Sequence, residues 1–169
     1  MDTIDCIFLK SVIKRLLYYK VLADKTFARL DDAQLHYQPN QESNSIAIII
    51  QHVSGNMLSR WTDFLNSDGE KDWRERDGEF EVQQFTKTKL IAIWEKGWAC
   101  CINILQSLVD EDLCKIITIR QEPLTVLDAI NRQLSHYPYH VGQIVYLGKI
   151  LTNDKWQSLS IARKKPDNF

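Results

Sequence analysis

The sequence has little of what would build a disulfide framework, a membrane span or a surface for nucleic acid. Only four of its 169 residues are cysteine, and no two of them form a CxxC pair. The longest apolar run is the five residues 46–50, far short of the roughly 20 that span a bilayer. Lys and Arg number 21 against 22 Asp and Glu, so no overall field attracts nucleic acid or an anionic membrane. We therefore expect neither as a partner.

Length and composition indicate an ordinary folded protein. At roughly 150 residues per domain, the chain is expected to form a single domain over residues 1–169. The acidic start, Met1 to Asp5, lacks the basic and apolar regions of a signal peptide, so a cytoplasmic location is expected. The four cysteines are then expected to be small buried hydrophobes in a reducing compartment.

Apolar residues recur at steps of three and four along four segments, as expected for amphipathic helices. These segments cover about residues 3–30, 45–66, 85–108 and 125–151. Only the β-branched run within 113–122 suggests strands, as a short strand or hairpin too small to form a core. The pattern therefore predicts an all-α fold, a four-helix bundle, and leaves the directions of the helices open.

The connections carry their own predictions. Residues 31–44 show turn chemistry, and Ser45 is expected to cap the helix that follows. Residues 70–81 lie in a long connection between the second and third helices, which we expect to be an ordered covering loop. Residues 153–169 are expected to be a mostly irregular tail whose basic patch, 163–165, is solvated.

Three histidines occupy comparable positions on two predicted helices. His136 and His140 are four residues apart and therefore share one helix face, beside the buried stripe. His52 occupies the same flank of the second helix, whereas His36 lies in a loop and is expected to serve packing. Buried polar groups at such seams need a mutual network, trapped water or a metal. Three neutral imidazoles suit Zn²⁺, Ni²⁺ or Fe²⁺ and leave a coordination position open.

Two motifs carry a resemblance to a known family. The segments 51–56 (QHVSGN) and 136–143 (HYPYHVGQ) resemble those of the DinB/YfiT-like four-helix metalloproteins. Further segments, at 44–47, 60–64, 68–71, 73–80 and 156–161, are similar to an uncharacterised bacterial subgroup of that superfamily. The similarity extends over nearly the whole chain.

The resemblance implies a fold, an assembly and a cofactor. It implies an up-down-down-up bundle, a homodimer, and a divalent metal, zinc or nickel, held by His52, His136 and His140. Relatives with assigned activities are transferases or isomerases that use low-molecular-weight thiols such as bacillithiol or mycothiol. We therefore expect a metal-dependent transferase that activates such a thiol against a small-molecule substrate.

Three further residues are candidates for the substrate or for support of the ligands. Asn56, one turn after His52, and Gln143, three residues after His140, are placed either to orient substrate or to hydrogen-bond the ligands. Arg60 is the candidate clamp for an anion, with an ion pair to the acidic loop as the alternative. Arg74 and Arg76 carry the same two interpretations.

Other functions stay open at this stage. A metal-dependent hydrolase is one, although no Glu lies one helical turn from any of the three histidines to shuttle a proton. A non-catalytic, stress-related protein that uses the metal as a scaffold is another. DNA binding is the weakest, because neither a basic face nor a helix-turn-helix signature is present.

Overall fold

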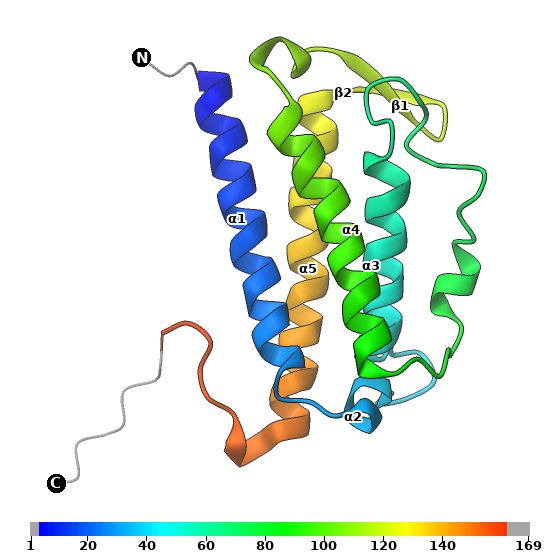
Figure 1. Cartoon of the computed structure of the whole chain (residues 1–169), viewed down its shortest axis with the longest axis vertical. Helices are drawn as coiled ribbons and strands as arrows, with labels where there is room; N and C mark the ends of the chain where they lie inside the picture. The colour runs from blue at the N-terminus through cyan, green and yellow to red at the C-terminus, as the bar shows by residue number, and fades with distance from the viewer. Residues whose placement is uncertain (1–3, 162–169) are drawn as a thin grey trace, which may run out of the picture.

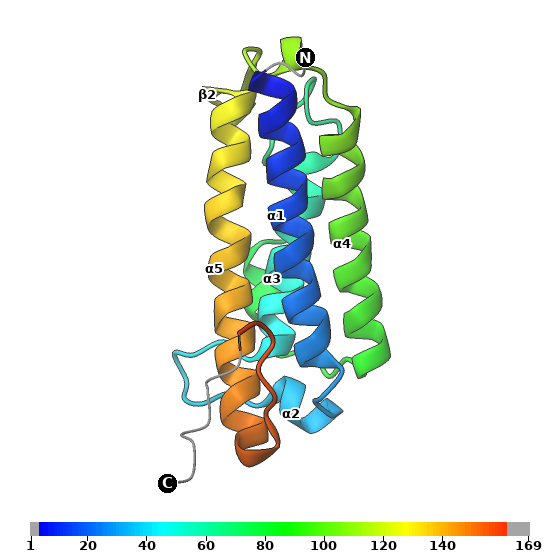
Figure 2. The same ribbon diagram turned by 90° about the vertical axis from the view of Figure 1, so that its left-hand side faces the viewer.

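Four long helices make up most of the structure. The computed structural model describes residues 4–161, with side chains from residue 7 onward. The long helices are α1 (Ile4–Phe27), α3 (Ile46–Trp61), α4 (Lys87–Ser107) and α5 (Val126–Thr152). They lie side by side, and α1 and α5 run in one direction while α3 and α4 run in the other (Figures 1 and 2). The prediction of a mostly helical protein is confirmed.

Capping residues set where these helices begin. Ser45, Thr86 and Thr125 each accept a hydrogen bond from the backbone N–H three residues further on, at 3.2, 3.3 and 3.1 Å. The predicted starts near 45 and 125 are therefore confirmed. The predicted end of the second helix at 66 is wrong: α3 ends at Trp61, and Asp63 takes the left-handed φ of 48°, which a helix cannot continue through.

The prediction of turns alone over residues 31–44 is wrong for its first part, where the short helix α2 (Asp32–His36) forms. The Asp31 carboxylate accepts from the Gln34 N–H at 2.8 Å, and the Gln34 side chain accepts from the Asp31 N–H at 3.0 Å. This reciprocal cap satisfies two free donors at once. Leu35 is fully buried and anchors the turn of helix to the core.

The predicted hairpin is confirmed as strands β1 (Ile116–Ile119) and β2 (Glu122–Thr125), paired antiparallel. Its two turn residues, Arg120 and Gln121, have φ values of 55° and 64°, as in the tight turns that match strand twist. The Asp68 carboxylate accepts from both of their N–H groups at 2.8 Å. The chain just after α3 is thereby fastened to the hairpin.

The long connection between α3 and α4 is ordered, as predicted. It contains the 3₁₀ turn η1 (Asp77–Phe80), which packs against α3 (Figure 1). Two further 3₁₀ turns, η2 (Asp110–Asp112) and η3 (Asn153–Lys155), follow α4 and α5. The tail is irregular from there to residue 161, and the predicted basic patch at 163–165 lies outside the described residues.

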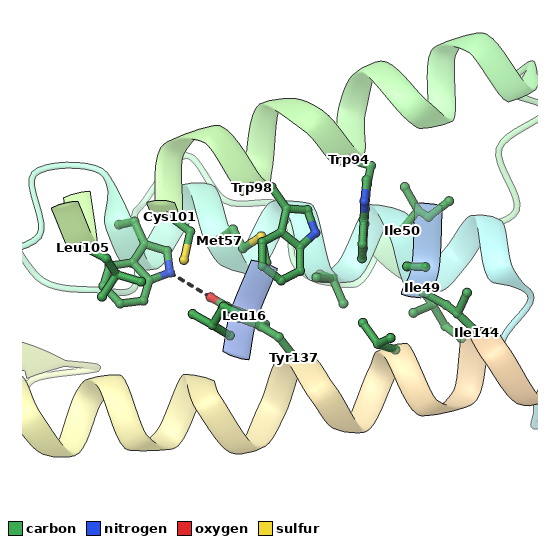
Figure 3. Packing of buried hydrophobic residues seen from close by; sticks show 14 of the residues in the cluster. Leu16, Ile49, Ile50, Met57, Trp94, Trp98, Cys101, Leu105, Tyr137 and Ile144 are labelled. Carbon is green, nitrogen blue, oxygen red and sulfur yellow. Dashed lines mark hydrogen bonds between the residues drawn. The ribbon is translucent and has the colours of Figure 1, made fainter. Parts of the chain in front are cut away.

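The core lies between the four long helices. Trp94 and Trp98 of α4 point toward Tyr137 and Ile144 of α5, with Leu16 of α1 beside them (Figure 3). All five side chains are at most 1% exposed. Within residues 4–161, no helix combines the length and the apolar character needed to cross a membrane.

Gly97 lets α4 approach α3 closely. A Cβ at this position would lie 2.9 Å from the Cα of Ser54 on α3, a distance that real Cβ atoms essentially never show. Ser54 is two residues from His52, so the same contact fixes the depth at which α3 sits.

Gly97→Ala is expected to lower the free energy of unfolding by about 1–3 kcal/mol, because the added methyl must push two helix backbones apart. Gly142→Ala is the matched control, since a Cβ there meets nothing within 4 Å. That variant is expected to gain up to about 1 kcal/mol from helix propensity. Urea unfolding of both variants measures the difference, and equal effects would contradict the close approach.

Candidate metal centre

The three predicted metal ligands come from two helices. His52 lies on α3, and His136 and His140 lie one turn apart on α5. Each is followed by a side chain that is at most 1% exposed: Val53, Tyr137 and Val141. Burial of these neighbours fixes the rotation of both helices, so the imidazoles share the seam between them.

Nitrogen atoms of the three rings converge. The Nε2 atoms of His52 and His136 are 3.4 Å apart, and those of His136 and His140 are 3.0 Å apart. One ligand atom from each ring lies within 4.8 Å of the others. Neighbouring ligands of a tetrahedral ion at about 2.0–2.1 Å are about 3.3 Å from one another. The three histidines therefore form a group that could hold a metal ion.

The other nitrogen of each ring, Nδ1, faces an oxygen. The partners are Oε2 of Glu79 for His52 (3.0 Å), Oε1 of Gln133 for His136 (3.4 Å) and Oε1 of Gln143 for His140 (2.8 Å). An amide oxygen or an ionised carboxylate can only accept, so each Nδ1 carries the hydrogen. In a neutral ring this leaves Nε2 with a free lone pair, the form that binds metals.

Burial keeps two of the rings neutral. The pKa of His136 is lowered to about 3, mainly by burial, with smaller contributions from the neighbouring His140 and His52 and from two arginines. Burial also lowers the pKa of His140, against the opposing effect of its bond to Gln143. The two Nε2 atoms that face each other at 3.0 Å thus have no hydrogen to share. A cation between them turns this repulsion of lone pairs into coordination.

Glu79 is a site residue that the sequence does not reveal. No Glu lies one helical turn from a histidine along the chain, but the loop folds back and η1 brings Glu79 to His52. Gly55 makes the room, because a Cβ there would overlap the Glu79 carboxylate. The Phe80 ring lies against the His52 ring with 4.8 Å between centroids. In the sequence, the one indication of this contact is Gly55, a glycine within a predicted helix three residues after His52.

One arginine, Arg74, holds this glutamate in place. Arg74 donates to both Glu79 oxygens, at 2.7 and 2.8 Å, and also pairs with Glu70 at 3.3 Å. Burial alone would raise the pKa of Glu79, but hydrogen bonds from His52 and Arg74 outweigh it and lower that pKa. Glu79 is therefore an ionised acceptor, which is what an Nδ1–H of His52 requires.

The other candidate residues also have partners. Gln143 hydrogen-bonds His140, and Asn56 accepts from the Tyr137 hydroxyl at 3.1 Å. Arg60 donates to the Gly69 carbonyl and pairs with Glu70 at 3.0 Å, which is the ion pair that the sequence offers as an alternative to an anion clamp. Contact of Asn56 or Arg60 with a substrate stays a prediction. His36, as expected, serves packing and hydrogen-bonds the Phe85 carbonyl at 2.7 Å.

A pocket of about 270 Å³ opens beside the imidazoles of His52 and His136. Its other lining residues are all polar: Asn56, Arg60, Arg74, Arg76, Arg120, Arg132 and Gln133. A small molecule can therefore reach the rings from one side. Three histidines fill only part of the coordination sphere of a divalent ion, so this is the side on which a further ligand can bind.

One family matches nearly the whole chain. It is described as a protein of unknown function, DUF1572, and the match covers residues 4–165. The chain belongs to this family. No curated protein matches it. Within the family, the structure of this DUF1572 chain adds a possible site for a divalent metal, formed by His52, His136 and His140.

Without metal, the chain is expected to become less stable as the pH falls from about 6.5 toward 5. The unfolded His136 takes up a proton near pH 6.5, whereas the folded one does so only near pH 3, so protons favour unfolding between these values. This amounts to about 2 kcal/mol at pH 5. Denaturant unfolding of chelator-treated protein at pH 7.5 and 5 measures it.

His136→Asn is the control, since it removes the titrating group. It should flatten the pH dependence between 7.5 and 5, leaving the smaller contribution of His140. An equally steep fall in this variant, or a rise in stability on acidification of the parent chain, would contradict the assignment.

Proposed function

We propose that this chain is a DinB-like, metal-dependent transferase that joins a low-molecular-weight thiol to a small electrophilic substrate. The helix directions and the positions of the three histidines support the DinB-like assignment, including its up-down-down-up bundle. The observation that carries the function is the Nε2 pair of His136 and His140, which carries no hydrogen and of which His136 lines an open polar pocket. A divalent ion held there, zinc or nickel, would ionise a bound thiol near neutral pH.

The surrounding residues prepare the site for such chemistry. Glu79 and Gln143 orient the rings of His52 and His140 through their Nδ1 hydrogens. The oxygen of the Asn56 side chain accepts from the Tyr137 hydroxyl. Asn56 also lines the pocket, where its NH₂ group would donate to a substrate. With the ligands held in advance, little reorganisation is needed when the thiol binds.

The proposed reaction is a substitution at carbon. The thiol releases its proton to solvent, its sulfur forms a bond to the electrophilic carbon, and the bond to the leaving group breaks, with that group taking the electron pair. Bacillithiol and mycothiol are the thiols proposed, in line with the resemblance to thiol-using relatives.

The hydrogen bonds and the pKa of Glu79 argue against hydrolysis as the main activity. A general base for water needs a free oxygen and a pKa near neutrality. Both Glu79 oxygens are engaged by Arg74 or His52, and its pKa is lowered. The pocket beside the histidines, in turn, favours an enzyme over a metal scaffold, which would need no access for a small molecule. A homodimer in the cytoplasm stays a prediction.

Thiol binding is tested with the cobalt-substituted chain. Adding bacillithiol or mycothiol is expected to produce a sulfur-to-cobalt charge-transfer absorption, because the thiol enters the coordination sphere as thiolate. Turnover is then measured with the zinc- or nickel-loaded chain and an uncharged aryl chloride, by appearance of the thioether. We expect a rate above the metal-free control by at least about a hundredfold.

The control is His136→Ala with His140→Ala, which removes two of the three proposed ligands. It should show neither the absorption nor turnover. Turnover by this variant at the rate of the parent chain, or no charge-transfer absorption with any thiol, would refute the proposal.

A further inference from the structure

The pocket beside the histidines is lined by an unusual number of arginines. Five of its nine lining residues are Arg60, Arg74, Arg76, Arg120 and Arg132, and none of the nine is acidic. Two carboxylates behind the pocket wall, those of Glu70 and Glu79, pair with three of these arginines. They offset only part of the positive charge, so the wall keeps a cationic surplus.

Three of the arginines, Arg60, Arg74 and Arg120, form ion pairs with carboxylates of the protein itself. Arg60 and Arg74 are buried and bind Glu70 and Glu79, and Arg120 binds Glu70 at 2.9 Å. Arg74 directs Nε and both of its terminal nitrogens to the two glutamates, whereas Arg120 engages Glu70 through Nε alone. Toward the pocket they contribute mainly positive potential, which is stronger in a partly enclosed site than in open water.

The guanidinium groups of Arg76 and Arg132 have no carboxylate partner closer than 3.6 Å within residues 4–161. Arg132 is exposed, and its side chain makes no hydrogen bond or ion pair with any residue in the described range 4–161. The one ion pair of the Arg76 side chain within the described residues is a 3.6 Å contact with Asp77, whose own side chain is fully exposed. Exposed pairs of this kind contribute little. A ligand can therefore bind both guanidinium groups without breaking a strong interaction within the protein.

These two arginines approach the histidines from different elements. Arg132 lies four residues before His136 on α5 and thus on the same helix face. The Arg76 guanidinium lies 5.6 Å from the Phe80 ring, which packs against His52. A group held between Arg76 and Arg132 would therefore sit next to the imidazoles that line the same pocket.

We propose that Arg76 and Arg132 bind a doubly charged anionic group, a phosphate or a dicarboxylate, on the electrophilic substrate. The planar fork of a guanidinium matches both groups, and the remaining arginines of the pocket add the field that favours a second negative charge. A pocket of about 270 Å³ limits the substrate to a small one. This inference rests on the proposed function, since it names the class of substrate that the thiol attacks.

The test is calorimetric titration of inorganic phosphate and of succinate into the full chain at low ionic strength, with and without bound metal. Both forms of the chain are expected to bind at least one of the two anions. The double variant Arg76→Gln, Arg132→Gln is expected to bind it at least about tenfold more weakly, as each lost charge-assisted pair predicts. Its metal content should equal that of the parent chain.

Arg15→Gln is the matched control. Arg15 is exposed on α1, away from the pocket residues, and its replacement removes the same unit charge. Its affinity for the anion should equal that of the parent chain. A preference for phosphate would identify a phosphate ester as the substrate class, and a preference for succinate would identify a dicarboxylate.

Three results would overturn the inference: no binding of either anion, equal binding by the double variant, or binding that disappears when the metal is removed. The last would place the anion on the metal itself. Turnover with the uncharged aryl chloride separates the two proposals. If the chain turns it over but binds neither anion, only the anion site is wrong. If it binds an anion but never transfers a thiol, the anion site stands, whereas the proposed function and the assignment of the anion to an electrophilic substrate are wrong.

Discussion

The structure around the site depends on one constraint: two imidazole nitrogens without hydrogens face each other at 3.0 Å. Such an arrangement is unfavourable by itself, since neither atom can donate. It persists because α5 is held by its buried face, and because oxygens on the far side of each ring fix which nitrogen carries the hydrogen. A cation is the simplest group that satisfies all the lone pairs together.

Two small neighbouring residues of α3, Ser54 and Gly55, let other parts of the chain pack close to His52. Ser54 faces Gly97, which lets α4 approach on one side. Gly55 faces Glu79, which lets the loop approach on the other. The loop is further fastened by Asp68 to the hairpin and by Glu70 to three arginines. Helix packing and loop docking therefore converge on the turn of α3 that follows His52.

The sequence predicts the helices well because their burial follows a regular period, and it predicts the three histidines because each precedes a member of the buried stripe. It misses α2, whose five residues are too few for a period and are set by a capping box. It also misses Glu79, which lies 27 residues from His52 along the chain. Only the folding of the loop onto Gly55 brings the two together, and local patterns do not encode such a contact.

The three-histidine metal site is tested most directly by identifying the ligands of the bound metal. X-ray absorption spectroscopy of the chain loaded with one equivalent of zinc or nickel, beside elemental analysis of the His136→Ala, His140→Ala variant, identifies them. A metal centre built by His52, His136 and His140 would show three imidazoles and at least one further light-atom ligand in the parent chain, and the variant would hold little metal. Equal metal content in both proteins, or a coordination shell without imidazole, would contradict it.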